Sequence, residues 1–394
     1  MLLIIFSCLL TLSAANVQNI TQSEFSANGV PTFPQLALKY GWNCEEYDVV
    51  TEDGYILKVF HITGNESKKP VLLMHGILDS ADSYVIRGEI SIAINLAEAG
   101  YDVWAGNVRG NKYSRRNVNL SPDKNKYRFW DFTFHEMGIY DLPATIDFIL
   151  AKTGKQKLSA IGHSQGTTMF YALGSVKPEY NEKISVFISL APIAYLNDIS
   201  TSLRGLIKLW PIINGFFIGL GYEGVLQDQS AGNELVKFLC TLGEIGYDLC
   251  VKGVLASLAG EDSEQLEPEF LDVLVDHYPA GTSRKAFSHY VQISNSGRFA
   301  QYDYGTLKNM ILYKKATPPA YDLWKVTMPT VLLAGKNDGV SGIKDVERLR
   351  DELGNVVRYH VMEREKFNHV DFVWGKNMNV YMTPLLRDLL REFA

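Results

Sequence analysis

The sequence predicts an α/β fold with a mostly parallel sheet, helices on both faces of that sheet, and an inserted helical cap. In the first half of the chain, short apolar runs alternate with helical stretches, an order that implies right-handed crossovers between parallel strands. From Leu196 to about Tyr313 the pattern is mainly helical, and strand-like runs then resume. The core is therefore expected in two parts, residues 16–195 and 314–394, with the cap formed by residues 196–313.

The elements of the core follow in order along the chain. A hairpin is expected first, at residues 47–60, because the side chains alternate in character and the chain turns at Asp53-Gly54. Later strands are indicated by short apolar runs, at residues 71–74, 101–105, 157–161, 184–190, 330–334 and 356–361. Helices are indicated by amphipathic stretches, several of which end at glycine, at residues 90–99, 140–152 and 382–393.

The composition is that of a globular protein. Of 394 residues, 46% are hydrophobic and 21% are charged, which supplies enough apolar surface for a core. The net charge of −6 provides no basic field for phosphate backbones, so nucleic acid is not expected as a partner. Beyond the N-terminus, no stretch is long and apolar enough for a stable membrane span.

The first 15 residues have the pattern of a signal peptide. An almost unbroken apolar run, Leu2 to Leu12, precedes the small residues Ser13-Ala14-Ala15 that a signal peptidase prefers. The alternative is an N-terminal core helix. Export would place the protein outside the cell or, as the alternative, in the lysosomal lumen. It would also permit glycosylation at the three Asn-x-Ser/Thr sequons, Asn19, Asn65 and Asn119.

The cysteines fit an exported protein without a metal site. Three remain after the signal peptide, and Cys240 with Cys250 is the natural local pair for a disulfide. Cys44 is then left over, and we expect it to be a buried thiol and not a nucleophile. Two cysteines ten residues apart without a nearby histidine pair make a poor zinc site.

One motif carries the chemistry. Gly162-His-Ser164-Gln-Gly166 is the only Gly-x-Ser-x-Gly in the chain, and it lies between a strand-like run and a helix-forming stretch. A nucleophile elbow needs this strand–turn–helix context, which exposes a serine hydroxyl at the edge of the sheet. The alternative is an ordinary glycine-rich turn. In the elbow interpretation, Ser164 is the nucleophile.

A serine hydroxyl needs a general base and a group that orients that base. In this class of fold the partners follow the serine in the order acid, then histidine. Asp338 comes directly after a strand-like run, and His369 follows the next strand, so both are expected at the same edge of the sheet as Ser164. Asp371 breaks the expected order, and His360 lies within a strand.

The oxyanion of the transition state needs two donors, usually backbone amides. Gln165, directly after the nucleophile, is expected to supply one amide. Leu78, in the loop after the strand at 71–74, is the candidate for the other. The sequence lacks the phosphate-loop, dinucleotide and His-Glu-x-x-His motifs, so neither a cofactor nor a metal ion is expected.

Motifs along most of the chain resemble one known family, the acid lipases, which include gastric lipase and lysosomal acid lipase and have many insect members. These motifs are His75-Gly-Ile-Leu, Gly106-Asn-Val-Arg-Gly-Asn, Phe129-Trp-Asp-Phe-Thr-Phe-His-Glu-Met, Gly162-His-Ser-Gln-Gly, Pro279-Ala-Gly-Thr-Ser and Phe367-Asn-His-Val-Asp-Phe. The resemblance implies an α/β-hydrolase that cleaves triacylglycerols or sterol esters, with Ser164, Asp338 and His369 as the triad and Leu78 and Gln165 as oxyanion donors.

The expected substrate is therefore a lipid ester at a lipid–water interface, cleaved through an acyl-enzyme on Ser164. A cap segment with Trp210, Phe216, Phe217 and Ile218 is apolar enough to enter such an interface or, alternatively, to pack onto the core. A carboxylesterase of small soluble esters is the alternative within the same chemistry. A non-catalytic lipid-binding protein with a hydrolase fold is a further alternative.

Overall fold

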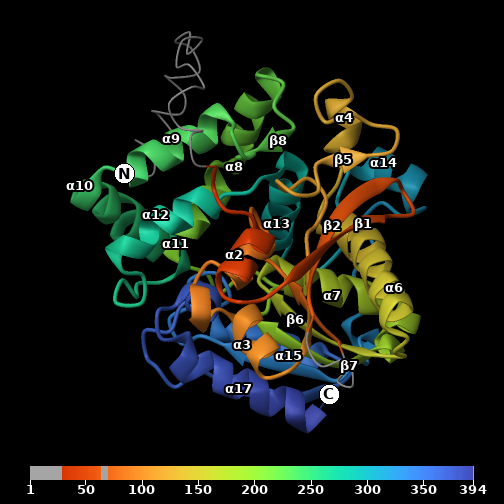
Figure 1. The fold of residues 1–394 in the computed structure, drawn as a ribbon. Coiled ribbons are helices and arrows are strands. Elements are labelled where there is room, and N and C mark those ends of the chain that lie inside the picture. Colours follow the sequence, from red (N-terminus) through yellow and green to blue (C-terminus); the bar gives the residue numbers. More distant parts are fainter. Residues whose placement is uncertain (1–28, 64–69, 394) are drawn as a thin grey trace.

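The computed structural model describes residues 29–63 and 70–393, and its centre is one nine-stranded sheet (Figure 1). Eight strands follow the order β1-β2-β4-β3-β6-β7-β10-β11, and β5 pairs with β2 beside this path. The strands are β1 (Cys44–Val50), β2 (Tyr55–Ile62), β3 (Pro70–Met74), β4 (Asp102–Gly106), β5 (Arg116–Asn117), β6 (Leu158–His163), β7 (Ile184–Leu190), β10 (Thr330–Ala334) and β11 (Val356–Val361).

The sheet is antiparallel at one end and parallel in the rest. β1 and β2 form the hairpin that the sequence predicts, with Val50 opposite Ile56 beside the turn. β2 also pairs antiparallel with β4, whereas every pair from β4 to β11 is parallel. The predicted strands are confirmed, with ends displaced by three residues or fewer.

Both faces of the inner parallel strands β3, β4, β6, β7 and β10 are buried, which explains their continuous apolar runs, whereas the edge strand β11 is only partly buried. In β3, Val71 and Leu73 belong to one apolar core, while Leu72 and Met74 point into the other. Side chains alternate between the faces of a strand, so each parallel strand contributes to two cores at once.

Helices cover both faces of the sheet. α6 (Leu142–Thr153), α7 (Gln165–Val176) and α15 (Ile343–Glu352) bury their apolar residues in the core that contains Leu72. The opposite core is covered by α2 (Phe33–Lys39), α3 (Ile92–Glu98), α16 (Asp371–Trp374) and α17 (Met378–Phe393). Two short helices, α4 (Lys126–Phe129) and α5 (Phe134–Glu136), precede α6. The last helix begins four residues earlier than the predicted 382, because Met378 is buried against the core.

The segment between β7 and β10 is mainly helical, as the sequence predicts. Its helices are α8 (Thr201–Gly219), α9 (Ala231–Cys240), α10 (Gly243–Tyr247), α11 (Ala256–Ala259), α12 (Pro268–His277), α13 (Arg284–Ser296) and α14 (Thr306–Leu312). A two-stranded ladder joins β8 (Gly224–Val225) to β9 (Thr282–Ser283). Serine hydroxyls cap α8 and α13, where Ser200 and Ser283 accept backbone amides of the first turn. Figure 1 shows α8 to α12 gathered at the upper left, well away from α6.

Candidate active site

Ser164 occupies the turn between β6 and α7. Its φ of 53° lies in the left-handed region, which is costly for a residue with a side chain. The flanking glycines make this turn possible. A Cβ on Gly162 would lie 3.0 Å from the carbonyl carbon of Gly166, and a Cβ on Gly166 would lie 3.0 Å from the His75 carbonyl oxygen. The turn therefore has the close packing that a nucleophile elbow requires.

The structure brings Ser164, His369 and Asp338 into one hydrogen-bonded chain. The Ser164 hydroxyl lies 2.9 Å from Nε2 of His369, and Nδ1 of His369 lies 2.9 and 3.0 Å from the two Asp338 oxygens. All three residues are buried, each less than one-tenth exposed. With Nδ1 donating to the carboxylate, Nε2 is free to accept the serine proton.

The backbone holds the acid and the base in place. Asp338 follows β10, and one of its oxygens accepts the amides of Val340 and Ser341 at 2.8 and 2.7 Å. The carbonyl of His369 accepts a hydrogen bond from Nε2 of His163 at 2.8 Å. Burial, helped by the neighbouring His369, lowers the pKa of His163 to about 3. His163 is therefore neutral at ordinary pH, and its ring supports the loop that carries His369.

One of the two predicted oxyanion donors begins a helix and the other lies in a loop. Gln165 is the first residue of α7, and Leu78 lies in the loop after β3 with φ of 60°. Among the residues that the structure describes, neither backbone amide has a hydrogen-bond acceptor. Their free donors and their positions beside the carboxyl ends of β6 and β3 are compatible with an oxyanion hole.

His75 shapes the loop that carries Leu78. Its Nδ1 donates to the Gly76 carbonyl at 2.9 Å, and its Nε2 accepts the Val108 amide at 3.2 Å. Burial lowers the pKa of His75 to about 4, so the ring stays neutral and can accept that amide. These contacts give His75 a structural role in the loop after β3.

Two histidines of the helical segment have partners of their own. His289 contacts the Ala300 carbonyl within the helical segment, and His277 contacts the Asp82 carboxylate. Asp371 lies near His369 in sequence, but one of its oxygens accepts the Asn368 amide, and it takes no part in the hydrogen-bonded chain of Ser164.

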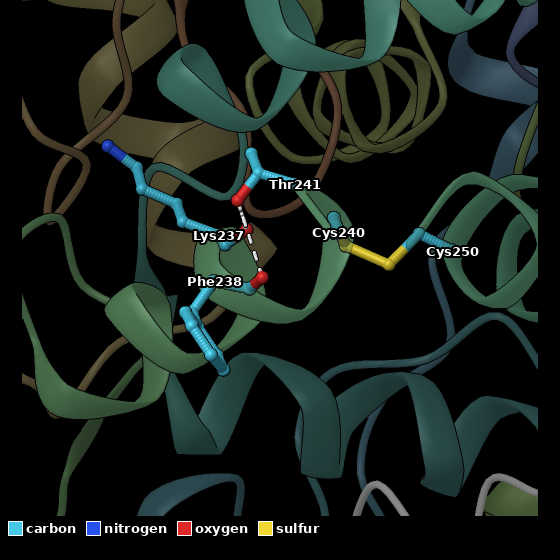
Figure 2. Close-up of a disulfide and its surroundings, with 5 residues drawn as sticks. All are labelled: Lys237, Phe238, Cys240, Thr241 and Cys250. Atoms are coloured by element: carbon cyan, nitrogen blue, oxygen red, sulfur yellow. Dashed lines mark hydrogen bonds between the residues drawn. A yellow bond between two sulfur atoms is a disulfide. The ribbon is translucent and has the colours of Figure 1, made fainter. Parts of the chain in front are cut away.

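Cys240 and Cys250 form a disulfide, with Cα atoms 5.6 Å apart (Figure 2). The bond joins the end of α9 to the irregular helix after α10. Figure 2 also shows the Phe238 side chain directed away from the disulfide. Cys44 is a free thiol, and it is half-buried where the sequence suggested a buried side chain. Burial raises its pKa to about 12, which disfavours the thiolate.

Asn119 is exposed, as a glycosylation site requires, whereas Asn19, Asn65 and the expected signal peptide lie outside the described residues. Across residues 29–63 and 70–393, no group of three or more His, Cys, Asp or Glu side chains could hold a metal ion. No helix in the same ranges is long and apolar enough to cross a membrane.

Sequence reasoning missed the contacts around the loop after β3. Asp82, Lys112 and His277 come together there although up to 195 residues separate them in the sequence. An unusual pair of acidic residues in a hydrophobic segment, Asp79 and Asp82, was the one available signal. Both are buried, and buried carboxylates require partners.

Two family models match the chain. The α/β hydrolase fold model covers residues 69–376, and the partial α/β-hydrolase lipase region covers residues 33–88. Solved structures similar to the chain include naproxen esterase from Bacillus subtilis, with a TM-score of 0.51, 14% identity and coverage of 90% of this chain and 94% of that one. An esterase from Exiguobacterium antarcticum has a TM-score of 0.51 and 15% identity, and the comparison covers 88% of this chain and 100% of that one. At such identities these two comparisons establish the fold.

Curated relatives are much more similar in sequence. Lipase 1 of Drosophila melanogaster is 40% identical, over 86% of this chain and 75% of its own length. Gastric triacylglycerol lipase of Rattus norvegicus is 38% identical, over 86% of this chain and 87% of its own length. Human lipase member K is 36% identical, over 91% of this chain and 90% of its own length. Together with the fold and the arrangement around Ser164, these comparisons identify the chain as a carboxylic ester hydrolase that belongs to the acid lipase family of α/β hydrolases.

Proposed function

We propose that this chain is a lipase that hydrolyses long-chain acylglycerols through an acyl-enzyme on Ser164. The observation that carries the assignment of residues is the hydrogen-bonded chain from Ser164 through His369 to Asp338. Support for the substrate class comes from relatives named as triacylglycerol lipases that share more than a third of the sequence.

In the first half-reaction, Oγ of Ser164 attacks the ester carbonyl carbon while its proton passes to Nε2 of His369. The negative charge that develops on the carbonyl oxygen is stabilised by the amides of Leu78 and Gln165. When the tetrahedral intermediate collapses, the C–O bond to the alcohol breaks, and His369 returns the proton to the leaving alcohol. Asp338 keeps Nδ1 protonated and stabilises the imidazolium that forms between these steps.

In the second half-reaction, water replaces the alcohol. His369 removes a proton from water, and the resulting hydroxide adds to the acyl carbon of the ester on Ser164. The intermediate collapses with release of the fatty acid, and the proton on Nε2 returns to Oγ of Ser164. The chemistry uses protein groups and water alone.

An exposed apolar surface on α8 supports a water-insoluble substrate. Ile212, Phe216 and Ile218 are 73%, 36% and 53% exposed, and of the nineteen residues in the helix only Ile207 is buried. Trp210 behaves differently, because its indole N–H donates to the Ser288 hydroxyl at 3.0 Å and its ring packs near Phe287. The outward residues of α8 are therefore the proposed contact with a lipid surface.

Residues 196–313 form the proposed cap, and residues 1–15 the proposed signal peptide. We further propose an exported glycoprotein, delivered outside the cell or to the lysosome, with Asn119 among its acceptor sites. Removal of N-linked glycans from protein secreted by cultured cells should lower its apparent mass. The Asn119→Gln variant should reduce that shift by one glycan.

The decisive experiment compares hydrolysis of emulsified long-chain triacylglycerol with hydrolysis of a soluble short-chain ester. The wild type should cleave both, and Ser164→Ala should cleave neither. Asp338→Asn should lower kcat by about 10⁴, because the base is then held in the wrong tautomer. Activity on the soluble ester alone would refute the lipase assignment in favour of a carboxylesterase. Full activity in Ser164→Ala would refute the nucleophile.

A further inference from the structure

The loop after β3 is fastened to the helical segment through one residue, Ala280. The Ala280 amide donates to the Leu78 carbonyl at 2.6 Å, and the Ala280 carbonyl accepts the Lys112 amide at 2.9 Å. Ala280 lies three residues after the end of α12, so it belongs to the segment expected to form the cap. One residue of that segment thus bonds directly to the peptide unit next to a proposed oxyanion donor.

A buried ion cluster lies beside this backbone contact. One oxygen of Asp82 lies 2.5 Å from Nζ of Lys112 and 2.7 Å from Nδ1 of His277, and the other accepts the Tyr113 hydroxyl at 2.9 Å. Asp82 is fully buried and His277 is 4% exposed. Burial alone would raise the pKa of Asp82, but Lys112 and His277 hold it below its usual range. The carboxylate is therefore charged and fully paired.

The backbone bonds and the ion cluster close a ring. Leu78 is bonded to Ala280, Ala280 to Lys112, and Lys112 to Asp82. Asp82 lies in a 3₁₀ helix, Ala81–Tyr84, that begins three residues after Leu78. His277, the last residue of α12, adds a second contact between α12 and this 3₁₀ helix, because its Nδ1 contacts the same Asp82 carboxylate. Three segments far apart in sequence are thereby locked around Leu78.

Leu78 needs such support, because its φ of 60° is unfavourable for a residue with a side chain. Such a conformation is costly and persists only where the surrounding structure holds it in place. An oxyanion hole acts through donors that are held in place before the reaction begins. The ring supplies that rigidity at the one donor that lies in a loop; the other, Gln165, is held by α7.

We propose that Asp82, with Lys112 and His277, is a positioning group that holds the Leu78 amide in place for catalysis by locking residues 277–280 onto the loop after β3. This inference rests on the proposed function, which assigns the Leu78 amide to the oxyanion hole. Its further consequence is that the donor geometry depends on the docked position of residues 277–280, so the hole is complete only when this part of the helical segment is seated.

The test compares Asp82→Asn, His277→Gln and a matched control, Glu267→Gln. Glu267 lies at the start of α12 and pairs with Arg87 at 2.5 Å, so its variant removes an ion pair of the same helix that does not contact Leu78. Each protein is assayed in single turnover with a soluble short-chain ester and with its thionoester. Sulfur accepts hydrogen bonds poorly, so the thionoester gains little from an oxyanion hole.

We expect Asp82→Asn and His277→Gln to slow acylation by the oxygen ester about tenfold, with the half-saturating concentration changed less than about twofold and the thionoester rate nearly unchanged. Glu267→Gln should leave both rates close to wild type. Equal losses on both substrates, or no loss, would overturn the proposal. Failure of both variants to fold would overturn it as well, because Asp82 would then be purely structural.

This result is distinguishable from failure of the proposed function. If Ser164 were not the nucleophile, Ser164→Ala would keep its activity on the oxygen ester, whatever the Asp82 variants did. If Ser164→Ala is inactive and the Asp82 variants retain the wild-type ratio of oxygen-ester to thionoester rates, only the positioning role fails.

Discussion

Gly166→Ala should lower kcat strongly, because it places one methyl group between the start of α7 and the loop after β3, which carry the two proposed oxyanion donors. The added Cβ would lie 3.0 Å from both the Met74 carbonyl carbon and the His75 carbonyl oxygen, and closer still to the Met74 oxygen. Met74 ends β3 and is paired with both β4 and β6, and His75 follows it directly, so these backbone atoms do not move easily. The start of α7 must therefore shift away from the loop after β3.

A displacement approaching 1 Å is enough to cost about 10² in kcat when the misplaced groups stabilise the transition state. Because the donors act on the oxyanion more than on the bound ester, KM should change little. The crowding should also lower the free energy of unfolding by about 1–3 kcal/mol. Both effects are measured on one preparation, by steady-state kinetics on a soluble ester and by urea denaturation.

Gly232→Ala is the matched control. Gly232 lies in α9, and a Cβ there would meet only the Leu226 side chain, at an ordinary distance of 3.6 Å. Alanine should raise the free energy of unfolding by up to about 1 kcal/mol and leave kcat unchanged. Wild-type kcat in Gly166→Ala would refute the reasoning, since the turn would then have absorbed the methyl group without disturbing the donors.

Three further variants test other parts of the structure. Arg109→Met should lower the free energy of unfolding by about 3–5 kcal/mol in urea denaturation, because it leaves the buried Asp141 carboxylate unpaired; a loss under about 1 kcal/mol would contradict this. Cys250→Ser should lower the free energy of unfolding by about 3 kcal/mol, the value expected for loss of a disulfide whose cysteines are ten residues apart in the sequence. Reduction of the wild type should give the same change in melting curves. For Asp371, burial raises the pKa well above the usual range. A carboxyl group with a raised folded pKa stabilises the protein below its unfolded pKa of about 4, and that contribution is lost as the pH rises through the folded value. Asp371→Asn should therefore reduce the loss of stability as the pH rises from the unfolded pKa to the folded pKa of this carboxyl group. An unchanged dependence of stability on pH would refute the role of Asp371.

The sequence predicted that Ser164, Asp338 and His369 lie together, because their grouping depends on chain order. A strand, a tight glycine-flanked turn and a helix predict where Ser164 lies, and parallel strands bring the residues that follow them to one edge. Asp338 and His369 follow two such strands, and the structure brings them to Ser164. Their catalytic roles stay a prediction until the variants are assayed.

Contacts between distant segments were not predictable in the same way. Asp82 and His277 belong to different elements, and neither lies in a periodic pattern or a motif that indicates the other. Their pairing is set by how α12 packs, which hydrophobic periodicity leaves undetermined. The exposure of α8 was open for the same reason, since an apolar stripe has the same sequence whether it faces solvent or core.

The direct pairing of β7 with β10 has a consequence for how this architecture diversifies. Ile188 lies opposite Val331 in one parallel ladder, although the whole helical block separates the two strands in the chain. The hydrogen bonds between β7 and β10 do not involve the helical block. Evolution can therefore lengthen, shorten or replace that block while the sheet keeps its register. Exchange of this block between two homologous enzymes, with residues 277–280 kept because they contact the loop after β3, should therefore transfer substrate preference while leaving the chemistry in place.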